Sequence, residues 1–141
     1  MEYEIKARWV HDWQFVATDA RGHSLAMDSP KMGEDSGFSP IEMLLIGLAG
    51  CTGMDVISIL KKKQQKVAEF EVRVGGERRP DPPRAWTRMH VEFIVRGHNI
   101  DPAAVERAVE LSETKYCSVQ ENLRSTVEFT RSIKIEEAAQ A

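Results

Sequence analysis

The sequence is short of the features that mark several large classes of protein. Only two cysteines occur among its 141 residues, aromatic residues make up 7%, and the formal net charge is -3. A charge this small and negative does not attract nucleic acid, so we expect no nucleic-acid partner. The first ten residues, MEYEIKARWV, lack the basic and apolar regions of a secretory signal. We therefore predict a cytoplasmic protein.

Closely spaced metal ligands are also missing. The four histidines form no pair four residues apart, and neither cysteine belongs to a Cys-x-x-Cys motif. With no local ligand signature, we predict no metal. Because cellular reductants keep most cytoplasmic thiols reduced, the two cysteines are expected to be either inert buried thiols or groups that cycle between redox states.

A chain of this length fits one domain, residues 1–141, with a single core. Six segments alternate apolar and polar residues with the period of two that is typical of half-buried strands. These segments are 2–9, 13–17, 25–27, 69–74, 90–96 and 127–135. The first three predict a meander, and the polar residues 30–38 predict a connector that leads from it into a helix.

The predicted central helix is apolar on every face. Ser39 is placed as its N-cap, Pro40 as its first residue, and Glu42 three residues after the cap, as in a capping box. Glu42 and Asp55 interrupt the apolar run, which favours a buried helix over a membrane span. A helix that is apolar all round must be buried all round, and a chain this short can hardly surround it, so we expect a second subunit as cover.

Three glycines recur along this helix at every third position, Gly47, Gly50 and Gly53. They form a flat strip that fits the backbone of a second subunit or, alternatively, a neighbour in the same chain. Two further helices are predicted after the fifth strand, one capped by Asp101-Pro102 and a short one beginning at Ser118. The resulting order, βββ-α-ββ-αα-β, indicates an α+β fold with antiparallel pairing.

The two cysteines occupy different local settings. Cys117 directly precedes the Ser118 helix start, where free amide groups and the helix dipole favour a thiolate. Cys51 lies inside the apolar central helix, where a cysteine ordinarily behaves as a small hydrophobic residue with a raised pKa. Taken one at a time, each cysteine is compatible with a purely structural role.

Two long segments together resemble a known family. SPIEMLLIGLAGCTGMDVISIL and, later in the chain, KYCSVQENL are similar to the signature of the OsmC/Ohr superfamily, and most similar to its YhfA-type branch. The similarity extends to ARWV near the N-terminus, GERR at residues 76–79 and EFIV at residues 92–95. This resemblance implies an OsmC-like fold, with curved antiparallel sheets around long central helices in an intertwined homodimer.

The resemblance also implies a chemistry. In the better-studied members, the cysteine that matches Cys51 attacks a hydroperoxide and becomes a sulfenic acid. The one that matches Cys117 then condenses with it to a disulfide, which dithiols reduce. This chemistry needs no metal and no organic cofactor, and its partners are a peroxide substrate and a dithiol reductant.

The sequence departs from the peroxidatic members at two positions. Their catalytic glutamate directly follows the proline, whereas here Ile41 holds that place and Glu42 comes one residue late, which rotates its side chain by about 100° on a helix. Their activating arginine has no counterpart in residues 10–13, and Arg8 and Arg21 are the nearest candidates. Glu42 is thus either a catalytic carboxylate or only the capping-box glutamate.

Three hypotheses follow. The first is a peroxidase of organic or hydrogen peroxides that uses Cys51 as nucleophile, Cys117 as resolving thiol and Glu42 as orienting carboxylate. The second is a non-catalytic dimer that binds a small molecule or senses redox state. The third leaves both thiols inert.

Overall fold

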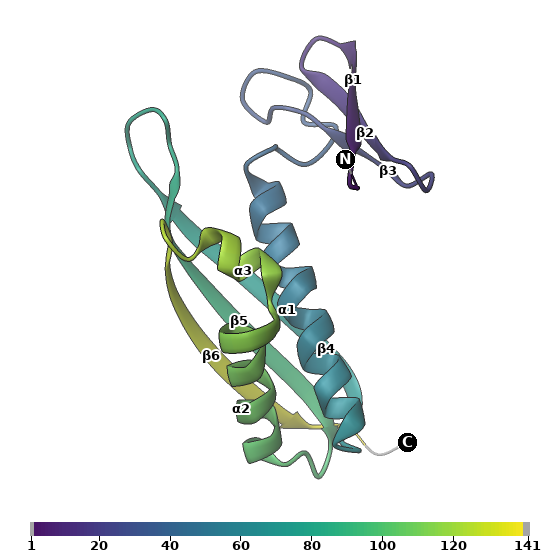
Figure 1. Cartoon of the computed structure of the whole chain (residues 1–141), viewed down its shortest axis with the longest axis vertical. Helices are drawn as coiled ribbons and strands as arrows, with labels where there is room; N and C mark the ends of the chain where they lie inside the picture. The colour runs from purple at the N-terminus through teal and green to yellow at the C-terminus, as the bar shows by residue number, and fades with distance from the viewer. Residues whose placement is uncertain (1, 140–141) are drawn as a thin grey trace. The chain divides into compact units, whose positions relative to one another are not determined.

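The computed structural model describes residues 2–139 (Figure 1). Met1, Gln140 and Ala141, which the single-domain prediction includes, lie outside the described residues. Two compact units divide the chain, Met1–Leu44 and Leu45–Ala141, and each is described by itself. The elements are β1 Ile5–His11, β2 Gln14–Asp19, β3 Ser24–Met27, α1 Glu42–Lys62, β4 Lys66–Arg78, β5 Trp86–His98, α2 Pro102–Leu111, the π-helical turn η1 Ser112–Tyr116, α3 Ser118–Leu123 and β6 Glu128–Glu137. The predicted element order is confirmed.

The first unit contains the predicted three-stranded meander. Strands β1, β2 and β3 pair antiparallel in sequence order, with Phe15 opposite Trp9 on one side and Met27 on the other. The turn from β2 to β3 is organised by Asp19, whose carboxylate accepts hydrogen bonds from the backbone N–H groups of Arg21 and His23. Local side-chain to backbone bonds of this kind are the usual reason for aspartate in turns.

Strand β1 is not half-buried, contrary to the expectation from its alternating sequence. All seven of its residues are exposed, and Trp9 keeps 66% of its surface accessible. The alternation of Ile5, Ala7 and Trp9 with charged residues is nevertheless real, so one face of this strand is apolar and uncovered within a single chain.

The connector after β3 is held together by a buried carboxylate. Asp28, which is 3% exposed, accepts hydrogen bonds from the backbone N–H of Ser29 and from both the N–H and the hydroxyl of Ser36. A parallel bridge between Met27 and Phe38 closes the loop. The polar composition of residues 30–38 therefore serves a defined set of hydrogen bonds.

The second unit is built on a sheet with strand order β4-β5-β6. Strands β4 and β5 form the predicted antiparallel pair, with Val72 opposite Phe93. Strands β5 and β6 pair in parallel, with Phe93 opposite Ile133, which departs from the all-antiparallel expectation. The reason is the connection: α2, η1 and α3 cross over between β5 and β6, and a helical crossover of this kind returns the chain in the same direction.

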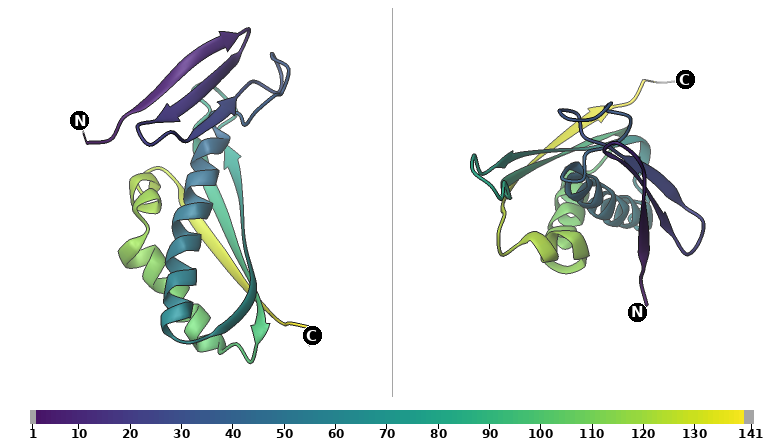
Figure 2. Two further views of the ribbon diagram at one scale, coloured as in Figure 1. Left: turned by 90° about the vertical axis from the view of Figure 1, so that its right-hand side faces the viewer. Right: turned by 90° about the horizontal axis from the view of Figure 1, so that it is seen from above.

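Helices α1 and α2 lie on one face of this sheet (Figure 2). The core between them includes the fully buried side chains of Leu48, Val56, Phe93 and Val105. On α1 the buried positions recur every four residues, at Leu48, Thr52, Val56 and Leu60. This spacing places them on a single stripe of the helix. Within one chain, α1 is therefore buried along one stripe and not on every face.

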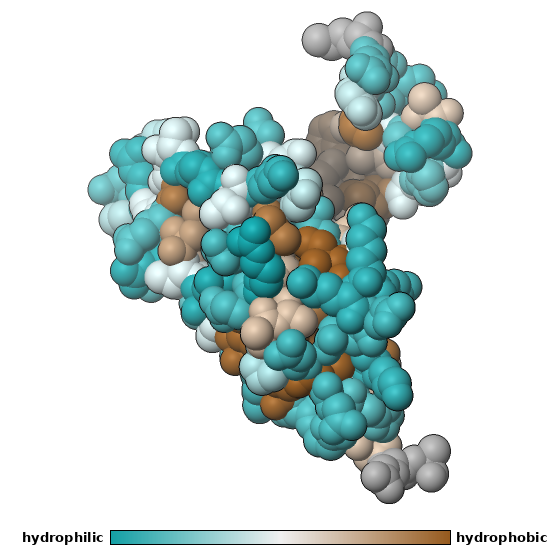
Figure 3. All heavy atoms as spheres, turned by 60° about the horizontal axis from the view of Figure 1, so that its bottom comes forward, coloured by the Kyte–Doolittle hydropathy of each residue, from teal (hydrophilic) through white to brown (hydrophobic). Residues whose placement is uncertain are grey.

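The opposite side of α1 remains open, and Met54 is 73% exposed. Figure 3 shows brown hydrophobic atoms lying at the surface between the teal polar ones. By length and composition alone α1 could cross a membrane, as could the core helices of many globular proteins. Large exposed apolar faces are common at interaction surfaces of proteins.

The three glycines of α1 do not all face the same kind of neighbour, which the sequence left open between a second subunit and the same chain. A Cβ added at Gly53 would contact Val72 of β4, and one added at Gly47 would contact Val119 of α3. Both glycines therefore face neighbours in the same chain. Gly50 has open space around it and remains available to a second chain.

Helix starts follow the predicted capping pattern, with one shift. Glu42 accepts hydrogen bonds from the backbone N–H and hydroxyl of Ser39, and Asp101 accepts one from the N–H of Ala103. Helix α3 begins at Ser118 as predicted, but its N-cap is Cys117, whereas the capping-box sequence SVQE predicts Ser118 in that role. The Sγ of Cys117 accepts a hydrogen bond from the N–H of Gln120 at 3.4 Å, so the sulfur itself does the capping.

Candidate functional site

The second unit brings both cysteines to one place. Cys51 and Asp55 are four residues apart on α1, a spacing that puts two side chains on the same face of a helix. Cys117 comes to this face from the start of α3. The two Sγ atoms and a carboxylate oxygen of Asp55 all lie within 4.8 Å of one another. Both cysteines are free thiols.

The turn before α3 is what positions Cys117. Its backbone N–H donates to the carbonyl of Ser112 at 2.8 Å, which closes the π-helical turn η1. The residue is extended, with φ -72 and ψ 100, as expected of an N-cap. These two constraints direct its side chain toward α1 and away from solvent, leaving Cys117 only 4% exposed.

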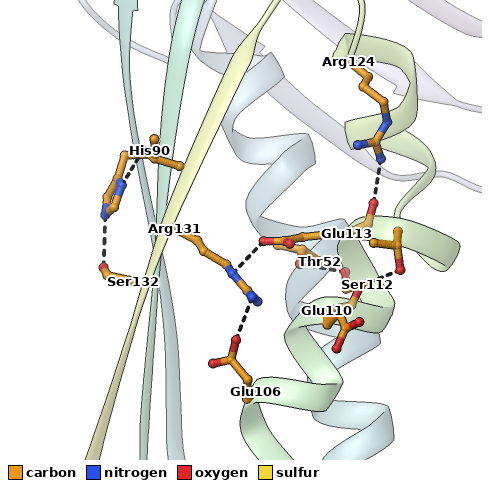
Figure 4. A network of polar contacts seen from close by, with 11 residues as sticks. Thr52, His90, Glu106, Glu110, Ser112, Glu113, Arg124, Arg131 and Ser132 are labelled. Carbon is orange, nitrogen blue, oxygen red and sulfur yellow. Dashed lines mark hydrogen bonds and ion pairs between the residues drawn. The ribbon is translucent and has the colours of Figure 1, made fainter.

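Buried hydroxyl groups fix the carboxylate beside the thiols. Thr52 and Ser112, both almost fully buried, share a hydrogen bond of 2.7 Å between their hydroxyls (Figure 4). The Ser112 hydroxyl also lies 2.9 Å from a carboxylate oxygen of Asp55, to which it donates. This chain of bonds ties α1 to the end of α2. It also holds Asp55 in one orientation next to both sulfurs.

The electrostatics of Cys117 oppose the thiolate expected from its helix-cap position. Burial is the largest effect and raises the pKa of Cys117 to about 11, against the lowering effect of the Gln120 N–H. A hydrogen bond with Cys51 and Coulombic interactions with Cys51 and Asp55 add to the rise in the pKa of Cys117. The cap interaction predicted from sequence is present, but desolvation outweighs it.

A pocket of about 420 Å³ opens beside Cys117. Its wall carries two cationic side chains, Lys115 and Arg124. Arg124 is already engaged, since it pairs with Glu121 at 2.9 Å and donates to the carbonyl of Glu113. The pocket gives a small molecule a route to the neighbourhood of the buried thiol.

Glu42 and the candidate arginines belong to the first unit. The Glu42 carboxylate is occupied by Ser39, whose hydrogen bonds hold the pKa of Glu42 below its ordinary value. Arg8 is exposed, and Arg21 forms an ion pair with Asp19 at 3.0 Å. The capping role of Glu42 is thus observed, and its catalytic role stays a prediction.

Three polar residues of this site were not predicted from the sequence. Asp55 interrupts the apolar run of α1, and its spacing of four residues from Cys51 is the sequence signal that puts both on one helix face. Thr52 is a polar residue on the buried stripe of α1, and Ser112 continues the buried face of α2. A buried polar residue requires a hydrogen-bond partner. The positions of Thr52 and Ser112 on buried helix faces therefore indicate a buried polar network.

Comparison with known proteins places the chain among relatives of similar length. Residues 33–132 match the family described as OsmC-like protein. Protein YhfA of Escherichia coli K12 is 40% identical over 132 residues, which cover 94% of this chain and 97% of YhfA. A hypothetical protein of Aquifex aeolicus VF5 is 26% identical with a TM-score of 0.86, covering 97% of this chain and 98% of that one.

A more distant likeness extends to a protein with a functional name. The organic hydroperoxide resistance protein OhrB of Bacillus subtilis shares the fold at 17% identity, with a TM-score of 0.63 and coverage of 94% of this chain and 97% of OhrB. The family match spans most of the chain and includes both cysteines. This protein is therefore a member of the OsmC-like family.

Proposed function

We propose that this protein is a cytoplasmic, thiol-based reductase of organic or hydrogen peroxides that works with two cysteines and acts as a homodimer. The observation that carries the proposal is the proximity of the two Sγ atoms, within 4.8 Å of each other. A disulfide needs its sulfurs about 2 Å apart, so the approach still required is less than about 3 Å. Membership of a family that includes redox proteins supports the same chemistry.

The roles of the two cysteines follow from their exposure. Cys51 is half-buried, whereas Cys117 is 4% exposed and its thiol has a raised pKa, so we assign the attack on the peroxide to Cys51. Its sulfur attacks one oxygen of the hydroperoxide ROOH and breaks the O–O bond. The alcohol ROH leaves with the thiol proton, and Cys51 becomes a sulfenic acid.

The second thiol completes the cycle. The Cys117 sulfur attacks the sulfenic sulfur, a disulfide forms, and water leaves with the hydroxyl group and the Cys117 proton. A dithiol reductant then restores both thiols by exchange and becomes a disulfide itself. The electrons come from the dithiol, so the proposed cycle draws on no metal and no organic cofactor.

Homodimer formation is proposed from the uncovered apolar surfaces. Met54 on α1 and Trp9 on β1 are large hydrophobic residues with most of their surface open. A second copy of the chain offers the matching apolar faces. Burying such faces is the main favourable contribution to stable association between subunits.

The central test is direct. The reduced protein is mixed with one equivalent of cumene hydroperoxide and its free thiols are counted before and after. The proposal expects loss of both thiols, with a Cys51–Cys117 disulfide found by peptide mapping. Cys51→Ser should abolish peroxide consumption, whereas Cys117→Ser should consume one equivalent and stop at the sulfenic acid. Consumption retained in Cys51→Ser would rule the proposal out.

Glu42 is proposed as an orienting carboxylate in addition to its capping role. Glu42→Gln separates the catalytic role from the capping role, because glutamine can keep the capping-box hydrogen bonds but has no carboxylate. A catalytic carboxylate predicts a lower rate of peroxide reduction at an unchanged melting temperature. An unchanged rate would leave Glu42 with the cap alone.

A second candidate is a redox sensor or binding protein of the same fold that lacks turnover. This candidate is favoured because the group clustered with the two thiols is the carboxylate of Asp55 and not a cation. A nearby carboxylate disfavours the thiolate that attacks a peroxide. Oxidation at one thiol, followed by slow reduction, would support this candidate over the peroxidase.

A further inference from the structure

The Cys51, Cys117 and Asp55 cluster has the composition of a metal site as well as that of a redox centre. Its three potential ligand atoms, two sulfurs and one carboxylate oxygen, lie within 4.8 Å of one another. A tetrahedral zinc ion with Zn–S bonds of about 2.3 Å separates its ligands by about 3.8 Å. A contraction of at most about 1 Å would therefore bring the three atoms to the spacing of zinc ligands.

We propose that the reduced protein binds one thiophilic divalent cation of the zinc class between Cys51, Cys117 and Asp55. Two thiolates and one carboxylate match the ligand preferences of zinc, and three protein ligands leave a fourth position open to water or another small ligand. The proposal rests on the geometry of the reduced site and does not require that the protein reduce peroxides.

The surroundings of the cluster resemble the outer shell of a metal site. The carboxylate of Asp55 accepts a hydrogen bond from Ser112, which is held in turn by Thr52. Ligand carboxylates in metal sites are commonly fixed by such hydrogen bonds. On the other side, the N–H of Gln120 points at the sulfur of Cys117. Both ligand types are thus oriented before any ion arrives.

Charge also favours a cation at this point. Three groups that are anionic as ligands converge in a partly buried space, and a dication placed between them replaces their mutual repulsion by attraction. Each thiol that coordinates the ion releases its proton to solvent, and no electron is transferred. Because the bound ion holds the same sulfur electrons that attack a peroxide, metal binding and thiol oxidation exclude each other.

A second cluster of candidate ligands provides an internal control. His11, Asp12 and Glu34 also bring their ligand atoms within 4.8 Å, but all three are exposed and none is a thiol. Cobalt bound there would show no thiolate charge-transfer absorption. The two clusters are therefore distinguished by spectroscopy on the same full-length chain.

The test is titration of the reduced, full-length protein with Co²⁺ in the absence of oxygen and peroxide. We expect a thiolate-to-cobalt charge-transfer band that saturates at one equivalent and disappears when Zn²⁺ is added. Cys51→Ser and Cys117→Ser should each lose the band, and Asp55→Asn should weaken binding by at least 10-fold. His11→Ala should leave the band unchanged.

Thermal unfolding gives a second readout that does not depend on colour. Zn²⁺ should raise the melting temperature of the wild-type protein and have no such effect on Cys51→Ser. Absence of the charge-transfer band in the reduced wild type, or its survival in either cysteine variant, would overturn the metal site. Peroxide consumption is measured separately after treatment with EDTA, so failure of the peroxidase proposal and failure of the metal proposal remain distinguishable.

Discussion

The N-terminal sheet and the helix-covered sheet differ in where their apolar side chains lie. Every buried hydrophobic residue of the described chain belongs to the second unit, from Leu48 to Val127. The only buried residue of the first unit, among those described, is the polar Asp28. Both units alternate apolar and polar residues along their strands, so the sequence pattern alone does not explain the difference.

This difference identifies which part of the chain stabilises itself. A three-stranded sheet is stable when a hydrophobic face is packed against something, and the β4-β5-β6 sheet has α1 and α2 for that purpose. The β1-β2-β3 sheet leaves Trp9 and Ile5 largely open. We infer that the first unit depends on a further surface, which the proposed dimer would supply.

The largest expected effect is in the core of the second unit. Phe93 is 1% exposed on the central strand. Phe93→Ala should lower the unfolding free energy by about 3–5 kcal/mol, because a large cavity is left. Phe15→Ala is the matched change in the first unit, where the ring is 39% exposed. Urea unfolding measures both. An equal loss of unfolding free energy in the two variants at low protein concentration would contradict this difference between the two units.

The next effect concerns association. Trp9→Ala removes a large exposed aromatic side chain from the apolar face of β1 and should weaken dimerisation by about 2 kcal/mol, which is roughly 30-fold in the dissociation constant. Lys6→Ala, on the opposite face of the same strand, is the control and should have little effect. Sedimentation equilibrium reports both constants. A Trp9→Ala variant that associates like the wild type would place the interface elsewhere.

A smaller effect is expected in the buried hydroxyl network. Thr52→Val keeps the shape of the side chain but leaves the Ser112 hydroxyl without one partner, at a cost of about 1–3 kcal/mol. Thr114→Val, which removes an exposed hydroxyl that donates to the carbonyl of Glu110, should cost less than about 0.5 kcal/mol. Thermal unfolding of both variants tests whether burial of the hydroxyl group explains the larger loss of stability in Thr52→Val.

The smallest effect is a pH dependence in the first unit. Hydrogen bonds from Ser36 hold the pKa of Asp28 below its ordinary value. A lowered pKa means that the stabilisation is fully present above the pKa of the unfolded chain, about 3.9, and is lost as the pH falls through the lower pKa of the folded state.

An NMR titration of the Ser36 amide measures this pKa. The midpoint should lie below about 3.9, and in Asp28→Asn the titration should vanish while the amide exchanges faster. The Arg73 amide in the second unit serves as a reference whose exchange should be the same in both proteins. A midpoint at or above the ordinary value would contradict the role given to Asp28.

Local patterns predicted much of the fold. Alternation in segments such as 69–74 and 90–96 placed the strands, because side chains of a strand point to opposite faces in turn. Ser39 and Glu42 marked the start of α1, because a capping box involves residues only three positions apart. The family resemblance named Cys51 and Cys117 as one site, which no local pattern could have done.

The strands, the helix starts and the two candidate thiols could be predicted from the sequence, because each depends on residues that are neighbours in the chain. Tertiary structure decided that β5 and β6 run parallel, that Asp55 stands beside both sulfurs, and that burial overrides the helix cap in setting the pKa of Cys117. These outcomes depend on which distant segments pack together and on how much water they exclude, and neither quantity can be read from residues a few positions apart.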